Sequence, residues 1–247
     1  MEVRSRSPAR PAFYALAPGG WRDYVTLLHL PYTLWHLSYV VIGGCLAPHP
    51  NGGRLALTVL AFFLGMGVAA HALDELSGRP LQTRISTVML IGLALVSLGG
   101  ACAIGIAVAF AHDLWLLAFV AFGGFIAPAY NLELLGGRFH NWFWFATAWG
   151  AFPILTAYFA MADRITGEAV LAALFGALLT RAQQTLSTPV RDIRRRTVSV
   201  TGTIERTDGS RVSIRPETLT QPMETTLRFI ALATMTLAAA LLVLRFA

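Results

Sequence analysis

Seven stretches of the chain are long and apolar enough to cross a lipid bilayer, and short polar segments separate them. A membrane-spanning helix needs about 20 predominantly apolar residues. By this measure the pattern predicts seven spans, at residues 25–47, 55–73, 87–110, 113–132, 142–162, 167–186 and 225–246. The run from Val88 to Leu132 holds two of them, with a tight turn at its only polar break, His112-Asp113. We expect an all-α integral membrane protein with a bundle of about seven transmembrane helices.

Composition supports this class. Of the 247 residues, 55% are hydrophobic and only 13% are charged, and the mean hydropathy is +0.60. Soluble domains carry about 25% charged residues. The first 24 residues contain arginines and prolines in place of the apolar core of a secretory signal, so we interpret them as a basic arm before the first span.

Arginines set the expected orientation. With the N-terminus in the cytoplasm, the inner segments hold fourteen arginines and the outer loops and tail hold three, Arg54, Arg164 and Arg245. This bias is what the positive-inside rule predicts. The fourteen are Arg4, Arg6, Arg10, Arg22, Arg79, Arg84, Arg138, Arg191, Arg194, Arg195, Arg196, Arg206, Arg211 and Arg215. The expected protein is a multi-pass protein of the cytoplasmic (inner) membrane.

The expected organisation has four parts. Residues 1–24 form the basic cytoplasmic arm, and residues 25–190 form a six-helix membrane core with a site on its cytoplasmic face. Residues 191–223 form a cytoplasmic loop, and residues 224–247 the final span. In the loop, Thr197–Thr207 and Ser210–Arg215 alternate apolar and polar residues around Asp208-Gly209, a strong hairpin signal. Because a two-stranded ribbon alone is marginal in water, we expect the hairpin to pack on the bundle or to bind a partner.

Charge and cysteine content exclude several functions. The net charge of +6 belongs to arginines at the ends of spans, so it indicates membrane topology and no nucleic-acid partner. The chain has no lysine, which excludes Schiff-base chemistry. Cys45 and Cys102 stand singly in apolar runs, as packing residues do.

Ionisable residues gather at the inner ends of the spans. The stretch Ala70–Leu81 places His71, Asp74 and Glu75 at the end of the second span, with His71 and Asp74 on one helix face. The first span carries His29 and His36 on one face. The fourth and sixth spans end in further polar residues, namely Tyr130, Asn131, Glu133, Arg138, His140, Arg181, Gln183, Gln184, Arg191 and Asp192. Ionisable groups at membrane depth are expensive and mark functional sites.

Carboxylates beside arginines indicate a site for Mg²⁺ and a diphosphate. Acidic side chains hold the metal, the metal neutralises phosphate, and arginines bind the remaining oxygens. Asp74 and Glu75 would form one half of this site and Asp192 with Arg191 the other. The bundle interior would then hold an apolar tail.

Each feature also has a structural interpretation. The run Arg194–Arg196 is typical of a topology or headgroup anchor, and His29 and His36 can hydrogen-bond across helices. The aromatic run Trp142–Phe145 is typical of an interfacial belt. Asp74 and Glu75 can be simple helix-end residues, although acidic groups near a helix C-terminus oppose the helix dipole, which favours a function.

The order of these motifs resembles the UbiA superfamily of intramembrane prenyltransferases, over roughly residues 25–196. The stretch Ala70–Asp74 stands where the family has N-D-x-x-D, and Arg79-Pro80-Leu81 is similar to its R-P-L. Arg191-Asp192 is similar to the R-D that opens the second acidic motif. Tyr130 to Arg138 resembles the family's tyrosine-containing loop. The resemblance implies a helical bundle, a prenyl diphosphate as the lipid ligand, and Mg²⁺ held by two acidic loops.

The chain departs from the family at several acidic positions. Ala70 and His71 replace the first Asn and Asp, Gly78 replaces a further acidic residue, and Arg196 replaces the last Asp of the second motif. Family members usually have nine spans. The resemblance leaves Asp74 and Asp192 in register, with Glu75 as a substitute ligand.

Carried onto this chain, the resemblance assigns three sets of site residues. Metal ligands would be Asp74, Glu75 and Asp192, and the catalytic residues would be His71, Asp74, Tyr130 and Asp192. Substrate would be bound by Arg79, Asn131, Arg138, Arg181, Gln184 and Arg191.

Three functions remain open from the sequence. The first is transfer of a prenyl group from its diphosphate to a small or lipidic acceptor at the cytoplasmic face. The second is a non-catalytic or metal-independent relative that binds a lipid or quinone. The third is a membrane transporter or an assembly factor that docks through the hairpin.

Overall fold

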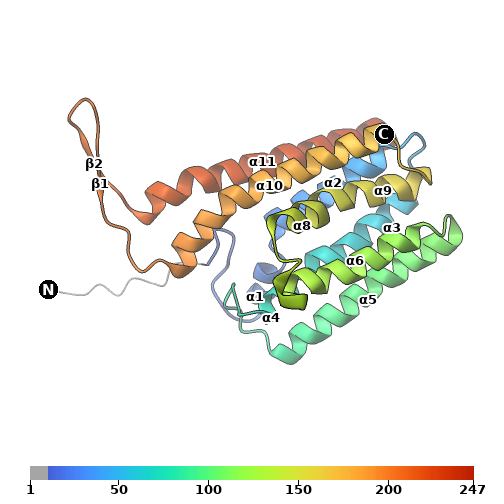
Figure 1. The fold of residues 1–247 in the computed structure, drawn as a ribbon, viewed down its shortest axis with the longest axis horizontal. Helices are drawn as coiled ribbons and strands as arrows, with labels where there is room; N and C mark the ends of the chain where they lie inside the picture. The colour runs from blue at the N-terminus through green and yellow to red at the C-terminus, as the bar shows by residue number, and fades with distance from the viewer. Residues whose placement is uncertain (1–10) are drawn as a thin grey trace.

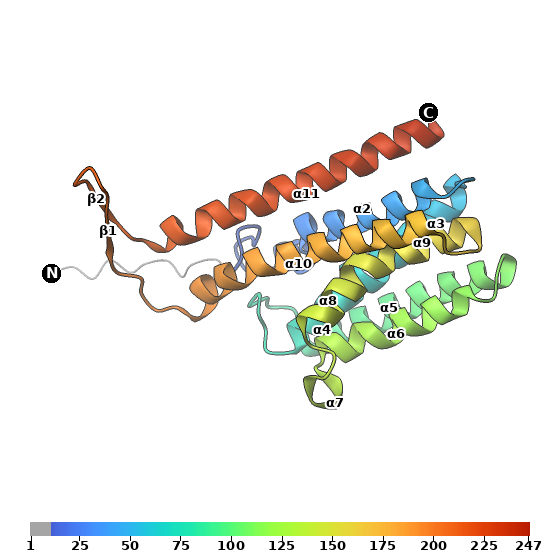
Figure 2. The ribbon, with the colours of Figure 1, turned by 45° about the horizontal axis from the view of Figure 1, so that its top comes forward.

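The computed structural model describes residues 11–247, which are mostly helical (74%) with one small two-stranded sheet (Figures 1 and 2). The charges Arg4, Arg6 and Arg10 of the basic arm lie outside the described residues. The elements, including two π-helices labelled η, are α1 (Trp21–Leu27), α2 (Leu30–Leu46), α3 (Gly52–Phe62), η1 (Phe63–Ala70), α4 (His71–Leu76), α5 (Thr87–Ala111), α6 (Leu116–Asn131), α7 (Leu134–Gly137), α8 (Trp142–Ala146), η2 (Thr147–Ala151), α9 (Phe152–Ala162), α10 (Gly167–Arg196), β1 (Thr203–Glu205), β2 (Arg211–Ser213) and α11 (Pro216–Phe246).

Within residues 11–247, five helices are long and apolar enough to cross a membrane, namely Gly52–Leu76, Thr87–Ala111, Trp142–Ala162, Gly167–Arg196 and Pro216–Phe246. The pair α1 and α2, bent by 45°, becomes a sixth span if it is counted as one. The seventh expected span corresponds to α6, which is apolar but has only 16 residues. The expected seven spans are therefore not confirmed. The fold is compatible with an integral multi-pass membrane protein whose apolar helices contact lipid.

Local sequence explains where the helices begin and end. Asn51 and Ser86 cap α3 and α5, because their side chains accept hydrogen bonds from Arg54 N and Met89 N. The expected turn at His112-Asp113 is present, since α5 ends at Ala111 and α6 begins at Leu116. The break between α1 and α2 falls at His29, which adopts the left-handed conformation (φ 46°). A non-glycine residue at positive φ is uncommon and marks a site held by its surroundings.

Small residues bring the central helices into close contact. At Gly43 in α2, an added Cβ would lie 2.3 Å from the carbonyl oxygen of Ile154 in α9. Gly150 in η2 and Gly176 in α10 approach each other in the same way, because a Cβ on Gly150 would lie 2.5 Å from Gly176 O. Close backbone approach at small residues is how helices associate within membranes. These contacts fix α2, α9 and α10 around one interior.

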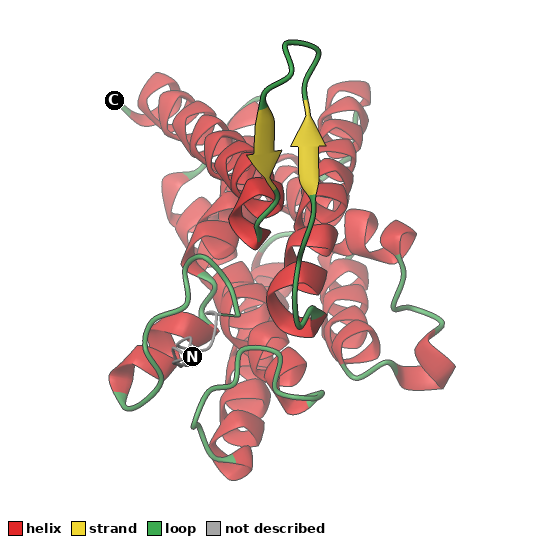
Figure 3. Cartoon of the chain, turned by 90° about the vertical axis from the view of Figure 1, so that its left-hand side faces the viewer, coloured by secondary structure: helices red, strands yellow, loops and turns green. Residues whose placement is uncertain are grey.

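The predicted hairpin is present, with Ile204 opposite Val212 and Glu205 opposite Arg211. Of its two expected roles, packing on the bundle is not observed, and binding of a partner stays a prediction. Figures 1 and 2 show the ribbon beyond the helix ends, and Figure 3 shows its two strands side by side. Every strand residue is exposed except the half-buried Val212. The cause is the length of α10, which ends at Arg196 and not near residue 186. Ten further residues carry the loop about 15 Å outward.

Candidate functional site

The first polar segment, His71–Ile85, is organised by a buried carboxylate. Glu75 in α4 has no exposed surface. One carboxylate oxygen accepts a bond from Leu81 N (2.9 Å), and the other accepts from Thr83 N and Thr83 Oγ1 (both 2.8 Å). Glu75 thus supplies the backbone of the loop after α4 with its hydrogen-bond partners, and both carboxylate oxygens are engaged in this role.

Arg79 has a similar structural role. Its guanidinium donates to Ile85 O (2.5 Å) and Thr87 Oγ1 (3.0 Å). The loop is also held by Asp23 of α1, a buried residue that sequence reasoning did not identify. Asp23 accepts from Gly19 N and Arg84 N, both at 2.9 Å. The only sequence signal for Asp23 is an acidic residue in the first helical turn after Gly19-Gly20.

Asp74, one residue before Glu75, faces a different environment. The charges that act most strongly on its carboxylate are the guanidinium groups of Arg195 and Arg191 on α10, followed by Glu75 and His140. Arg191 and Arg195 are four residues apart and share a helix face. Arg191 and Arg195 are thus near enough to act electrostatically on Asp74.

At the start of the second polar segment, Arg191–Arg215, some charged residues form ion pairs and one arginine points into the bundle. Arg194 forms a bidentate ion pair with Glu224 of α11, with Nε–Oε1 at 2.5 Å and Nη2–Oε2 at 2.9 Å. Asp192 is exposed and pairs with Arg196 at 3.6 Å. Arg195 instead points inward, and its Nε donates to the carbonyl of Pro11 (3.1 Å).

The expected magnesium ligands do not converge. Asp192 is not among the charges that act on Asp74, and Glu75 is engaged by the loop. Within residues 11–247, no three His, Cys, Asp or Glu side chains are placed to hold a metal ion. The residues do not fit a Mg²⁺ site shared by two acidic motifs.

Three histidines meet inside the bundle. The rings of His29 and His71 are stacked, with centroids 4.1 Å apart. His71 Nδ1 lies 3.0 Å from Gly67 O, so Nδ1 carries the proton and Nε2 is unprotonated in the neutral ring. His36 also lies close enough for His71 to influence it electrostatically. His29 Nε2 and His36 Nδ1 are buried without a hydrogen-bond partner.

Tyr130 and Asn131 end α6 next to this interior. The Tyr130 ring stacks on His140 (4.5 Å between centroids) and contacts Trp149 (4.6 Å). His140 Nδ1 donates to Tyr130 O (2.9 Å). Asn131 is buried and its Nδ2 donates to Ala127 O (2.7 Å), so it closes the end of α6.

The other predicted binding residues lie at or near the surface. Arg181 is exposed, donates to Gln184 Oε1 (2.7 Å), and its guanidinium lies over the Trp142 ring at 5.2 Å. Gln184 is half-buried, and Arg138, which follows α7, is exposed. Of the two arginines of α10 that act on Asp74, Arg195 is half-buried and Arg191 is exposed.

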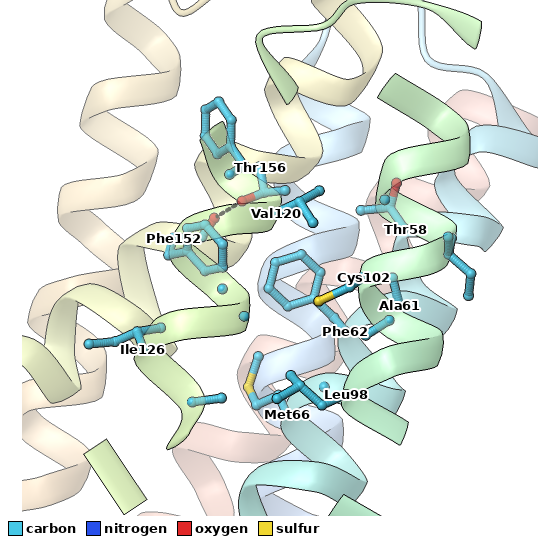
Figure 4. Close-up of a pocket in the computed structure, with 18 of the residues that line it drawn as sticks. Thr58, Ala61, Phe62, Met66, Leu98, Cys102, Val120, Ile126, Phe152 and Thr156 are labelled. Atoms are coloured by element: carbon cyan, nitrogen blue, oxygen red, sulfur yellow. Dashed lines mark hydrogen bonds between the residues drawn. The ribbon is translucent and has the colours of Figure 1, made fainter. Parts of the chain in front are cut away.

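An apolar cavity of about 120 Å³ lies between α3, η1, α5, α6 and α9 (Figure 4). The cavity is lined mainly by apolar side chains, and the hydroxyls of its threonines, Thr58 and Thr156, donate to Arg54 O and Phe152 O of their own helices. Ala70 and Trp149 line one end. Because Ala70 precedes His71 and Trp149 contacts Tyr130, this end adjoins the polar site.

The segment Pro11–Gly20 covers the polar site, whereas the sequence analysis placed it in a basic cytoplasmic arm. The Tyr14 hydroxyl is 3.0 Å from His29 Nδ1. Burial raises the pKa of the Tyr14 hydroxyl well above its usual value, and Tyr32 raises it further, although Arg195 and Arg191 oppose the shift. Tyr14 is thus a neutral phenol inside the site. Its signal in the sequence is an aromatic pair, Phe13-Tyr14, in a stretch of small residues and prolines that follows the arginines.

Comparisons with family models, with curated proteins and with solved structures found no match for this chain. The geometry of the site is therefore the basis for any functional conclusion.

Proposed function

We propose that this protein is a UbiA-like intramembrane protein that binds a prenyl diphosphate and transfers its prenyl group to a small or lipidic acceptor. One observation carries the proposal: an apolar cavity ends, at Ala70 and Trp149, beside a polar site in which Arg191 and Arg195 are near enough to act electrostatically on Asp74. An elongated apolar tail with an acidic head is the ligand that such a combination fits. The resemblance of the motifs to prenyltransferases selects the isoprenoid class.

The proposed reaction assigns roles to residues of this chain. The allylic C–O bond breaks, the diphosphate leaves with the electron pair, and the prenyl carbon bonds to the acceptor, which gives up a proton. Arg191 and Arg195 stabilise the charge on the departing diphosphate. His71 accepts the proton at Nε2, because its Nδ1 is committed to Gly67 O. No step is assigned to Mg²⁺, since the carboxylates do not converge.

A second function, non-catalytic binding of a lipid or quinone, is favoured by that same lack of convergence. In a prenyltransferase the diphosphate has to leave, and its charge has to be neutralised. If the arginines bind an acidic head without promoting C–O cleavage, the protein acts as a lipid-binding protein.

The test uses purified full-length protein in nanodiscs and radiolabelled geranylgeranyl diphosphate. Saturable binding is measured first, and diphosphate release is then followed after adding Mg²⁺ and a lipid extract of the host as the source of acceptor. Release together with a prenylated product supports transfer. Binding without release supports the second function. The absence of saturable binding overturns prenyl transfer and also the binding of a lipid with a diphosphate head.

A further inference from the structure

The segment Pro11–Gly20, called here the N-terminal strap, is packed into the polar site. Ala15 is 1% exposed and Ala12 is 8% exposed. The Phe13 ring lies under the guanidinium of Arg228 on α11 at 4.7 Å, and the Tyr14 ring contacts Tyr32 edge-on at 5.7 Å. A segment of mixed Ala, Pro and aromatic residues is thus held against α2, α10 and α11.

The strap engages the groups that an acidic ligand head would need. The carbonyl of Pro11 accepts the Nε–H of Arg195 (3.1 Å), and the Tyr14 hydroxyl bonds His29 Nδ1 (3.0 Å). Asp74, Arg191 and Arg195 are all close enough to act electrostatically on Tyr14. A neutral carbonyl is a weaker partner for a guanidinium than a phosphate oxygen. A diphosphate head can therefore compete with the strap for Arg195.

The C-terminal end of the strap is built as a hinge. Gly19 and Gly20 both have positive φ (122° and 61°), and nothing lies within 4 Å of where a Cβ would be at either glycine. Asp23, beyond the glycines, holds Gly19 N at 2.9 Å. Within the strap, Leu16 N donates to Thr26 Oγ1 (3.0 Å), a bond that breaks when the strap rotates. Paired glycines with open space permit backbone rotation at a fixed anchor.

We propose that the N-terminal strap is an autoinhibitory lid that an acidic ligand head displaces from Arg195 and His29 by rotation at Gly19-Gly20. This inference rests on the proposed function, because the competing ligand is a prenyl diphosphate. It adds regulation of access: the resting protein holds its site closed with its own chain, and a lipid without an acidic head leaves the lid in place.

Two alanines of the strap provide a matched pair for the test. Ala15 is buried and Ala17 is exposed, so Ala15→Glu forces the strap out while Ala17→Glu adds the same charge without doing so. Association of geranylgeranyl diphosphate with full-length protein in nanodiscs is measured for both variants and the wild type. We expect Ala15→Glu to bind about tenfold faster, as loss of one or two hydrogen bonds predicts, and Ala17→Glu to match the wild type.

A labelling experiment covers the case in which Ala15→Glu does not fold. A water-soluble maleimide is reacted with Ala15→Cys and Ala17→Cys, with the wild type as blank because Cys45 is buried and Cys102 lines the apolar cavity. We expect Ala15→Cys to react at least about tenfold more slowly than Ala17→Cys, and geranylgeranyl diphosphate to remove most of that difference.

The outcomes separate the lid from the function. Equal association rates in all three proteins, or bound diphosphate with Ala15→Cys still protected, overturn the lid and leave the proposed function standing. The absence of binding in every variant overturns both. Faster binding in Ala15→Glu alone, or ligand-dependent labelling of Ala15→Cys alone, supports the lid.

Discussion

The first and second polar segments both follow a membrane-type helix, yet they use their charges in different ways. In the first, Glu75 and Arg79 bind the backbone of the loop that follows them, and this loop is folded back onto the bundle. In the second, Arg194 and Arg195 reach across to α11 and to the strap, and the loop beyond them is an exposed hairpin. The comparison teaches that neighbours in one motif, such as Asp74 and Glu75, have separate roles.

The largest expected effect is on stability, when the hydrogen bonds that Glu75 accepts in the first polar segment are removed. Glu75→Ala leaves Leu81 N, Thr83 N and Thr83 Oγ1 without their acceptor. We expect a loss of about 4 kcal/mol of stability, because each buried unsatisfied donor costs roughly 1–3 kcal/mol. Thermal unfolding in detergent, followed by size-exclusion chromatography, measures it. The exposed Glu217→Ala is the control, and wild-type stability of Glu75→Ala would contradict the assignment.

The same segment contains a residue whose loss affects chemistry more than folding. His71→Phe keeps a ring to stack on His29 but removes the unprotonated Nε2. We expect prenyl transfer to fall at least about a hundredfold, as for other general bases, while the dissociation constant of geranylgeranyl diphosphate changes little. A parallel loss of binding and transfer would indicate that His71 has a structural role only.

The second segment is tested by neighbouring arginines. Arg195→Ala removes a cation that faces Asp74, whereas Arg196→Ala removes an exposed partner of Asp192. We expect the dissociation constant to rise about thirtyfold for Arg195→Ala, consistent with a charge-assisted hydrogen bond. Arg196→Ala is expected to bind like the wild type. Equal effects in calorimetric titrations would show that only net charge matters.

The smallest effect concerns the hairpin of the second segment. The Asp208 carboxylate accepts bonds from Ser210, and these hold its pKa below the usual value. The lowered pKa stabilises the turn above pH 3.8, and this contribution is lost as the pH falls through the folded-state pKa. Hydrogen exchange at Ser210 N, corrected for its intrinsic rate, should accelerate below that pH. In Asp208→Asn the corrected rate is expected to be independent of pH in this range.

Much of the fold could be predicted because its signals are local. The apolar runs, the turn at His112-Asp113 and the hairpin around Asp208-Gly209 each depend on a few adjacent residues. Helix ends were harder to place, because two helices extend beyond their apolar regions. The C-terminal end of α10 continues as a polar helix to Arg196, and α11 already begins at Pro216, before its apolar region. Hydropathy does not detect a helix once it leaves the bilayer.

The sequence predicts which segments lie near one another better than it predicts their contacts. That Arg191 acts on Asp74 follows from two motifs at one end of the bundle, whereas the roles of Glu75 and Arg79 depend on how the loop 77–86 folds. Tyr14 and Asp23 were missed because their partners, His29 and Arg84, are distant in sequence and no pattern connects them.

The π-helix η1 has a consequence for how this protein can tolerate insertions and deletions. Phe63–Ala70 directly precedes His71 and Asp74, and a π-helical turn accommodates an extra residue within a continuous helix. One residue removed from an α-helix rotates everything beyond it by about 100°, whereas the wider turns of η1 absorb one residue without that rotation. Deleting one residue from η1 would therefore restore α-helical winding and leave His71 beside His29. The same deletion in α3 would rotate His71 and Asp74 away from their neighbours, although no residue of the site had been changed.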